Sequence, residues 1–437
     1  MWSSTLAEDT CYRVPYGSGE LTFILPPGMR GLVIQPRPAE PLADVEAAIA
    51  ATLADPVNSP PLRELARPGD RACIVFTDGT RAVPDHLLVP ALLRELEAAG
   101  VRDEDITLLC GVGMHRPSTP QEKAQKLGSE VAARYRVVDH MPSDPALSAD
   151  LGTWDGMPLV VNRLAAEADL LIATGVVEPH QFAGYSGGRK TVAIGVGGEA
   201  TIAATHSPAM LDHPGTRLGQ IESNPFHQAV TESARRAGLR FILNVVQDGA
   251  HRVLAVRAGG PQAAFAELVE IARSVYEVEV AQQYDLVIAG VDPPKDVNLY
   301  QATRAASYLW FAPRPVVRPG GVILVPACCP EGVGQGVGER CFHRLLSSAD
   351  DLHSLIVHLR EEGYPPGGQR AYLVAQVLTG CQVIVVGAED PALMRQCHMT
   401  AAATMEEALG LAQARLGWRL EALIVPHALL TLPVVRE

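Results

Sequence analysis

The segment from residue 173 to 208 holds the densest set of side chains in this sequence that could do chemistry. It contains His180, Lys190 and His206 among closely spaced glycines, directly after the short apolar run 170–172. Glycines let the backbone approach a ligand closely, and exposed N–H groups at a helix start attract anions. An imidazole can also transfer protons near neutral pH. A hydrophobic core needs neither clustered glycines nor ionisable side chains, so we predict that the segment forms the floor of an active site.

Two further loops carry reactive side chains after apolar runs. The turn Asp78–Arg81 follows the run at 72–77, and His115 lies in a glycine-proline segment after the run at 105–110. An arginine at such a place can bind a carboxylate or phosphate through two parallel hydrogen bonds. A salt bridge within the turn is the simpler alternative for Asp78 and Arg81. Among 13 histidines, His115, His180 and His206 stand out because each flanks a glycine- or proline-rich turn.

Familiar short motifs do not account for these loops. The segment GYSGGRKT resembles a phosphate-binding P-loop, but Arg189 stands where that motif needs glycine. No GxGxxG follows the first buried run, so the dinucleotide-binding fingerprint is missing. The histidine spacing matches no zinc pattern such as HExxH, which leaves a zinc site built from the three histidines as a weak alternative.

Predicted strands and helices alternate along most of the chain. Buried-strand patterns occur at 72–77, 105–110, 169–174, 239–248 and 284–290, and helical patterns at 85–100, 224–238 and 261–283. This alternation predicts an α/β fold with mostly parallel sheets covered on both faces. Ligands of such sheets bind beyond the carboxyl ends of the strands, where all three candidate loops fall.

The length of the chain predicts two α/β domains. At 437 residues it exceeds what one ordinary core supports. We expect residues 1–278 to form a domain that binds a cofactor and carries the catalytic residues, with 405–437 as a segment that could complete it. Residues 284–398 are expected to form the second domain. The active site is predicted in the cleft between the two domains.

Composition restricts the class of partner. A net charge of −13 disfavours nucleic acid and anionic membranes. No run of 18 apolar residues occurs, and the N-terminus has no pattern of a signal peptide. The eight cysteines are scattered and include no CxxC pair, which is typical of reduced, buried thiols. We therefore expect a cytoplasmic protein that acts on a small molecule.

Taken together, the loops resemble those of the lactate racemase family, the nickel-pincer-nucleotide enzymes that racemise or epimerise 2-hydroxy acids. The motifs that carry the resemblance occur in family order between about residues 70 and 340: DGTR at 78–81, GMHRP at 113–117, PH at 179–180 with GYSGGRK at 184–190, His206, and YQ at 300–301. No single motif is specific, but their combination is.

The resemblance implies a role for each matching residue. His206 would coordinate nickel(II), which imidazole nitrogen suits. Lys190 would hold the cofactor, pyridinium-3,5-bisthiocarboxylic acid mononucleotide with nickel, covalently in some members. Asp78, Gly79, Thr80 and Arg81 would bind its phosphate-bearing part. His115 and His180 would be the paired proton acceptors and donors. Other proteins make and load this cofactor, so they are implied partners.

The residues that would bind the substrate depart from the family pattern at one position. Tyr300, Gln301 and the residue at position 304 would bind and orient the substrate carboxylate, but position 304 is arginine where lysine is usual. Arginine keeps the charge and brings a planar fork of longer reach. The expected substrate is therefore a 2-hydroxy acid that is either lactate-like or dicarboxylic, such as malate.

These residue types suit racemisation through a keto acid. The C2 proton of a 2-hydroxy acid is very weakly acidic, so transfer of hydride from C2 together with loss of the hydroxyl proton avoids a carbanion. The planar 2-keto acid can then take hydride back on either face, and histidines can accept and return the proton. Two alternatives stay open: a metal-dependent hydrolase or lyase with His115, His180 and His206 as ligands, and a non-catalytic protein that binds the pincer cofactor.

Overall fold

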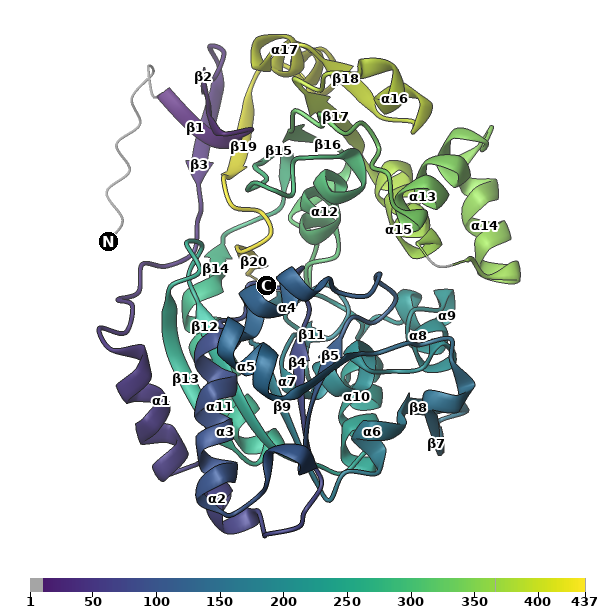
Figure 1. The fold of residues 1–437 in the computed structure, drawn as a ribbon. Coiled ribbons are helices and arrows are strands. Elements are labelled where there is room, and N and C mark those ends of the chain that lie inside the picture. Colours follow the sequence, from purple (N-terminus) through teal and green to yellow (C-terminus); the bar gives the residue numbers. More distant parts are fainter. Residues whose placement is uncertain (1–10, 366, 437) are drawn as a thin grey trace.

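The computed structural model describes residues 11–365 and 367–436, which form two six-stranded sheets in opposite halves of the molecule (Figure 1). Both sheets are mostly parallel and are covered by helices, as the sequence predicts. The expected α/β class is therefore confirmed. The N-terminal residues 1–10, whose sequence has no signal-peptide pattern, lie outside the described residues.

The first sheet has the strand order β13-β12-β9-β4-β5-β6. Only β12 and β13 are antiparallel. From β4 the chain moves outward through β5 and β6, and from β9 it moves the other way through β12 and β13, so β4 and β9 flank the topological switch point. Ligands of open α/β sheets bind at this point. The strands are β4 (Ala72–Thr77), β5 (Ile106–Gly111), β6 (Arg136–Asp139), β9 (Leu170–Val176), β12 (Leu239–Gln247) and β13 (Val253–Gly259).

The second sheet is parallel throughout, with the order β18-β17-β16-β15-β19-β3. Its switch point lies between β15 and β19, and the helix that carries position 304 follows β15. The strands are β3 (Met29–Val33), β15 (Tyr284–Ala289), β16 (Val317–Pro326), β17 (Gln382–Val386), β18 (Thr400–Ala402) and β19 (Leu420–Val425).

Four two-stranded pairs complete the β-structure. The hairpin β1 (Cys11–Tyr16) and β2 (Gly19–Ile24) packs on the second sheet, since Val14 and Phe23 share a core with Leu286. The other pairs are β7 (Ser148–Trp154) with β8 (Met157–Asn162), β10 (Pro179–His180) with β11 (Gly184–Tyr185), and β14 (Glu277–Val280) with β20 (Leu432–Val435). The last pair is parallel and lies between the two halves (Figure 1).

Helices cover both sheets. In the first half they are α1 (Val45–Ala54), α2 (Leu62–Leu65), α3 (Asp85–Ala98), α4 (Pro120–Leu127), α5 (Ser129–Arg134), α6 (Arg163–Ala166), α7 (Gly188–Lys190), α8 (Glu199–Thr205), α9 (Pro208–Asp212), α10 (Pro225–Arg236) and α11 (Pro261–Tyr276). In the second half they are α12 (Leu299–Trp310), α13 (Val337–Ser347), α14 (Leu352–Glu362), α15 (Gly368–Gly380), α16 (Pro391–Gln396) and α17 (Met405–Leu416). No helix among the described residues has the length and apolar character to cross a bilayer.

Local sequence explains the elements that position the candidate loops. Every residue of β4 and β9 is buried, as expected for strands covered on both faces. Helix α10 starts at an Asn224 cap followed by Pro225, and α12 starts at Asn298, whose side chain accepts a hydrogen bond from the Gln301 amide. The loops after β4 and β9 are thus held between rigid elements.

Strand pairing differs from the expected domain boundaries at both ends of the chain. Strand β3, within the expected first domain, is an edge strand of the second sheet, and β19 also joins that sheet rather than the first. Both are short strands whose sequences do not specify a sheet, and their partners are set by tertiary contacts. The second half of the molecule is therefore built from β1–β3 together with residues 284–425.

Three local elements differ from the sequence expectation. The helical pattern at 261–283 ends at Tyr276, because Glu277–Val280 pairs with β20. The hairpin β7–β8 and the strand β13 were not predicted from the sequence. Both belong to antiparallel pairs, whose patterns are weaker than those of the buried parallel strands.

A buried ion pair holds the turn after β4. Asp85, which is fully buried, accepts hydrogen bonds from the hydroxyls of Thr77 and Thr174 and lies 3.2 Å from the Lys126 ammonium. Lys126 also donates to the carbonyls of Arg81 and Val83, at 2.7 and 2.8 Å. The network joins β4, β9 and α4 directly beneath the Asp78–Arg81 turn.

Replacing Asp85 with asparagine should lower the free energy of unfolding by about 3–5 kcal/mol, because it leaves the Lys126 charge buried without its partner. Urea unfolding followed by circular dichroism measures this change. Glu167→Gln is the matched control, since it removes an exposed pair with Arg163 at 3.8 Å and should cost less than about 0.5 kcal/mol. Equal unfolding curves for the Asp85 and Glu167 variants would contradict the assigned role.

Candidate functional site

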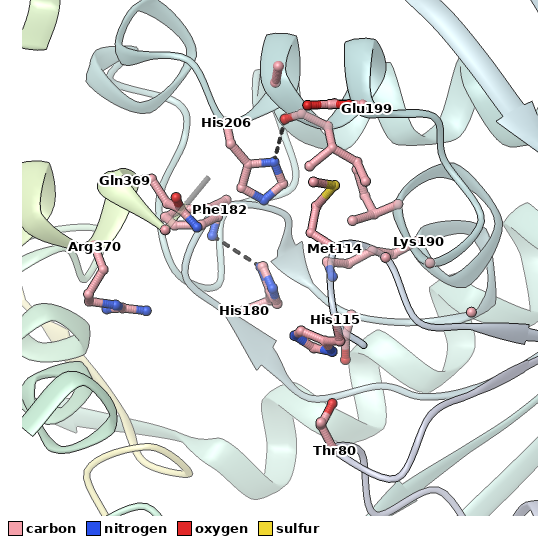
Figure 2. A pocket seen from close by; sticks show the side chains of 18 of the residues that line it. Thr80, Met114, His115, His180, Phe182, Lys190, Glu199, His206, Gln369 and Arg370 are labelled. Carbon is pink, nitrogen blue, oxygen red and sulfur yellow. Dashed lines mark hydrogen bonds between the residues drawn. The ribbon is translucent and has the colours of Figure 1, made fainter. Parts of the chain in front are cut away.

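The candidate loops meet around one cavity of about 600 Å³, between the carboxyl edge of the first sheet and the helices α12, α14 and α15 (Figure 2). A volume of this size is typical of sites for small molecules and cofactors. The cavity wall includes most of the residues predicted from sequence: Asp78, Thr80, Arg81, His115, His180, Lys190, His206, Tyr300 and Arg304. The predicted gathering of three distant histidines at one cavity is therefore observed.

Glycines bring the loop after β9 against the strand itself. Gly187 has a φ of +148°, and a Cβ on Gly175 would lie 2.9 Å from the Gly188 amide nitrogen. Side chains at these positions would separate the loop from the sheet. The loop continues into the short helix α7 and a π-helical turn over Thr191–Gly195, a rare geometry that is frequent at functional sites. This tight turn carries Lys190 at the cavity wall.

Arg189 turns away from the cavity although it neighbours Lys190. Its guanidinium carbon lies 3.8 Å from the centre of the Phe265 ring, and one nitrogen donates to the Thr231 hydroxyl at 2.9 Å. These contacts anchor the glycine-rich loop to α10 and α11. Arg189 therefore has a structural role, which is consistent with the failure of the P-loop interpretation.

Lys190 faces the cavity without forming an ion pair in the described part of the chain. Its burial, reinforced by the positive charge of Arg81, lowers the pKa of the ammonium to about 7. A group with this pKa is substantially a neutral amine at physiological pH, where an ordinary lysine is almost wholly charged. Lys190 can thus act as a nucleophile as well as a cation.

The lowered pKa predicts how Lys190 reacts with an acylating reagent. Lysine reacts as the neutral amine, so trace acetylation of Lys190 should rise with pH and level off above a midpoint near 7. In the denatured protein, where the Lys190 side chain is exposed to water, the same reaction should still rise near pH 10. Mass spectrometry of the labelled peptides separates the two. Parallel pH profiles would show that Lys190 is an ordinary lysine.

His206 presents one ring nitrogen to the cavity. It follows α8, and its Nδ1 donates to the Ile202 carbonyl at 2.9 Å, so Nε2 is left bare in the neutral ring. Phe182 and Phe226 pack edge-to-face on the ring. Burial, with a contribution from Lys190, lowers the pKa of His206 to about 4. A neutral imidazole whose orientation is fixed through its other nitrogen is what a metal ligand requires.

His180 and His115 carry their protons on different ring nitrogens. The Nδ1 of His180 accepts hydrogen bonds from the amides of Phe182 and Ala183, both at 3.2 Å, so its proton is on Nε2. The Nδ1 of His115 lies 2.7 Å from an Asp78 carboxylate oxygen and donates to it, which leaves Nε2 bare. His115 therefore offers a lone pair and His180 an N–H group.

The surroundings of His180 favour its neutral form, and those of Asp78 favour its ionised form. Burial and the nearby charge of Lys190 keep the pKa of His180 well below its ordinary value. Burial opposes ionisation of Asp78, but hydrogen bonds from His115 and Thr80 outweigh it and lower the pKa of this carboxyl group. An ionised carboxylate that orients a histidine is the arrangement of a general base.

Gln301 and Gly79 do not line the cavity that the other predicted residues share. Tyr300 and Arg304 are four residues apart on one face of α12 and both line the cavity, whereas Gln301 does not. The Gln301 side chain is rotated about 100° around the helix from Tyr300. Gly79 lines an adjoining cavity of about 610 Å³, which shares Asp78, Thr80, Arg81 and His115 with the first.

Sequence reasoning missed several residues of the cavity wall. Gln369 and Arg370, at the start of α15, face the cavity (Figure 2). Tyr364 also lines it and donates a hydrogen bond from its hydroxyl to the His206 carbonyl. The only sequence signal was the glycine pair Gly367–Gly368 before the helix, which has no histidine or motif beside it.

The alternative of a zinc site built from three histidines is not supported. Among residues 11–365 and 367–436, no group of three or more His, Cys, Asp or Glu side chains has the geometry to hold a metal ion. A single histidine such as His206 can bind a metal whose other ligands come from a cofactor, and Lys190 lies on the same wall. These residues fit a nickel-pincer nucleotide better than a metal ion held by protein alone.

The fold and the cavity define a doubly wound α/β protein with a cavity of small-molecule size at the switch point of its first sheet. Comparison with known proteins gives the family. Residues 16–219 match the Lactate racemase N-terminal domain, and residues 280–431 match the Lactate racemase C-terminal domain. The chain belongs to the lactate racemase family.

Individual relatives match this chain over most of their length. The chain is 32% identical over 385 residues to a lactate racemase of Lactiplantibacillus plantarum, covering 87% of this chain and 89% of the relative. It is 30% identical over 406 residues to a lactate racemase of Thermoanaerobacterium thermosaccharolyticum, covering 92% and 94%. The solved structure of the lactate racemase apoprotein from T. thermosaccharolyticum superposes with a TM-score of 0.86 at 30% identity, covering 98% of this chain and 100% of that one.

Proposed function

We propose that this protein inverts C2 of a 2-hydroxy carboxylic acid through a 2-keto acid, with a nickel-pincer nucleotide as its cofactor. The observation that carries the proposal is the pairing of His115 and His180 at one cavity, with a bare nitrogen on one ring and an N–H on the other. His206 and Lys190 on the same cavity wall would hold the cofactor, the first as a ligand of nickel and the second as its anchor. When bound, the cofactor supplies the acceptor and donor for the C2 hydride.

The chain's own residues bind the substrate and move the hydroxyl proton. Arg304 binds the substrate carboxylate and keeps it in place while C2 is planar. For a substrate whose hydroxyl faces His115, Nε2 of that ring accepts the proton, and the Asp78 carboxylate stabilises the resulting imidazolium. The Nε2–H of His180 donates a hydrogen bond to the substrate oxygen that faces it. When hydride returns to the other face of the planar intermediate, the His115 imidazolium gives the proton back to the oxygen, so the carbon is racemised without net gain or loss of a proton.

The walls of the cavity favour this chemistry over side reactions. The Phe182 and Phe226 rings around His206 keep water from that side of the cavity. A low-polarity wall strengthens the interaction of the arginine with the carboxylate. The Asp78–Arg81 turn, fixed from below by the Asp85 network, would hold the phosphate-bearing part of the cofactor.

The proposal is tested by incubating the cofactor-loaded protein with single enantiomers of several 2-hydroxy acids and following optical rotation. We expect the rotation of at least one acid to decay to zero, with chiral chromatography giving equal amounts of both enantiomers. A protein that holds stoichiometric nickel and cofactor but changes none of the acids would contradict the proposal and favour a cofactor-binding protein without catalytic activity.

A further inference from the structure

Two guanidinium groups from the second half of the chain line the cavity opposite the glycine-rich loop. Arg304 lies on α12 and Arg370 on α15 (Figure 2 shows Arg370). Arg370 is 6% exposed, although arginine is almost never fully buried without a partner. Over the described residues, the Nε atoms of both side chains are buried and have no hydrogen-bond partner.

The protein around these arginines provides little compensation for their charge. The polar contacts of Arg370 are Gln181, whose side-chain oxygen is 3.4 Å from a terminal nitrogen, and the Tyr300 ring, whose centre is 5.7 Å from the guanidinium carbon. Burial, together with the charge of Arg304, lowers the pKa of Arg370 to about 10. An uncompensated buried guanidinium is costly, so an anion is the expected partner.

The acidic side chains of the cavity do not serve as that partner. Asp78, Glu199 and Glu362 line the cavity, but Asp78 is hydrogen-bonded to His115 and Thr80. In the described part of the chain, neither Arg304 nor Arg370 lies within 4.0 Å of a carboxylate oxygen. Both guanidinium groups are therefore available to a ligand.

One carboxylate can be bound by one arginine through a bidentate pair of hydrogen bonds. A second arginine with its own unused donors indicates a second anionic group on the ligand. Resting on the proposed function, we infer that the substrate is a short 2-hydroxy dicarboxylic acid: Arg304 binds the carboxylate next to C2, and Arg370 binds the distal carboxylate. Arg370 is then the residue that separates dicarboxylic from monocarboxylic substrates.

The test compares malate with lactate for the cofactor-loaded wild type and for the Arg370→Gln and Arg370→Lys variants. For the wild type we expect kcat/KM to be about 10²-fold higher for malate than for lactate, the scale of losing charge-assisted hydrogen bonds. In Arg370→Gln, kcat/KM for malate should fall about 10²-fold while that for lactate stays within about threefold. Arg370→Lys should recover part of the loss, because lysine keeps the charge. Arg395→Gln, an exposed arginine on α16, is the matched control and should change neither.

Three results would overturn the inference. The first is a wild type that prefers lactate, and the second is an equal loss for both acids in Arg370→Gln, which would mean that both arginines bind one carboxylate. The third is loss of nickel and cofactor from Arg370→Gln, which would assign Arg370 to the phosphate of the cofactor.

Calorimetric binding of succinate, which has two carboxylates and no hydroxyl to oxidise, separates this inference from the proposed function. Binding of succinate that Arg370→Gln abolishes supports the dicarboxylate site even if no acid is racemised, in which case only the proposed function fails. Racemisation that is unaffected by Arg370→Gln for every acid, with no succinate binding, leaves the proposed function standing and rejects the dicarboxylate site.

Discussion

Replacing His206 with alanine should reduce racemisation by the cofactor-loaded protein more than 10²-fold and weaken its retention of nickel. His206 contributes the bare Nε2 of a neutral ring, and its other nitrogen is fixed by the Ile202 carbonyl. Loss of residues that merely support a metal ligand costs about 10- to 100-fold in metal affinity or activity, and loss of the ligand itself should cost at least as much. Nickel content after gel filtration and the rate of racemisation measure the two effects.

The fold should survive this substitution, because the His206 ring lies at the cavity wall and not within a sheet. His353→Ala is the matched control, since this histidine is exposed on α14, away from the cavity, and its loss should leave nickel content and rate unchanged. A His206→Ala protein that keeps both full nickel and more than a tenth of the wild-type rate would remove His206 from the proposed metal site.

Replacing His115 with alanine should lower kcat by about 10²- to 10⁴-fold while nickel and cofactor stay bound, because the variant loses a positioned proton acceptor and no cofactor ligand. Racemisation has an equilibrium constant of one, so kcat/KM must fall equally in both directions. The asymmetry between His115 and His180 should appear instead in a single turnover. The His115 variant should fail to form 2-keto acid because it lacks the proton acceptor, whereas His180→Ala, which loses only an N–H donor, should still form it at a reduced rate.

His86→Ala is the control for the His115 experiment, since His86 lines only the adjoining cavity, whereas His115 lines both. Its turnover should match the wild type. If His180→Ala abolishes formation of the 2-keto acid as fully as His115→Ala does, the assignment of separate proton acceptor and donor is wrong.

Much of the cavity could be predicted from sequence because its first half obeys a simple geometric rule. Asp78, His115 and His180 each follow a mostly apolar strand, and parallel strands bring their carboxyl ends to one edge of a sheet. The glycine pattern before Lys190 also has a local cause, namely the close contact of the loop with Gly175. Residue types, together with the position of each side chain just after a predicted parallel strand, were sufficient to predict this gathering.

No comparable rule predicts which residues the second half of the molecule contributes to the cavity. Arg370 lies on a helix of the other half, 66 positions after Arg304, and only the docking of the two halves brings it to the cavity. The sheet that β3 and β19 join could not be predicted either, because the sequence of a short strand does not encode which of two sheets it joins. The protonated nitrogen of each histidine also depends on backbone amides and a carboxylate that only the folded chain supplies.

The most direct test of this account is a crystal structure of the cofactor-loaded protein, with the metal located by anomalous scattering at the nickel edge. The account predicts a nickel ion within coordination distance of His206 Nε2, electron density for the cofactor next to Lys190, and His115 and His180 on opposite sides of the space left for the substrate. A nickel ion bound away from His206, or a cofactor that fills the space between His115 and His180, would contradict it.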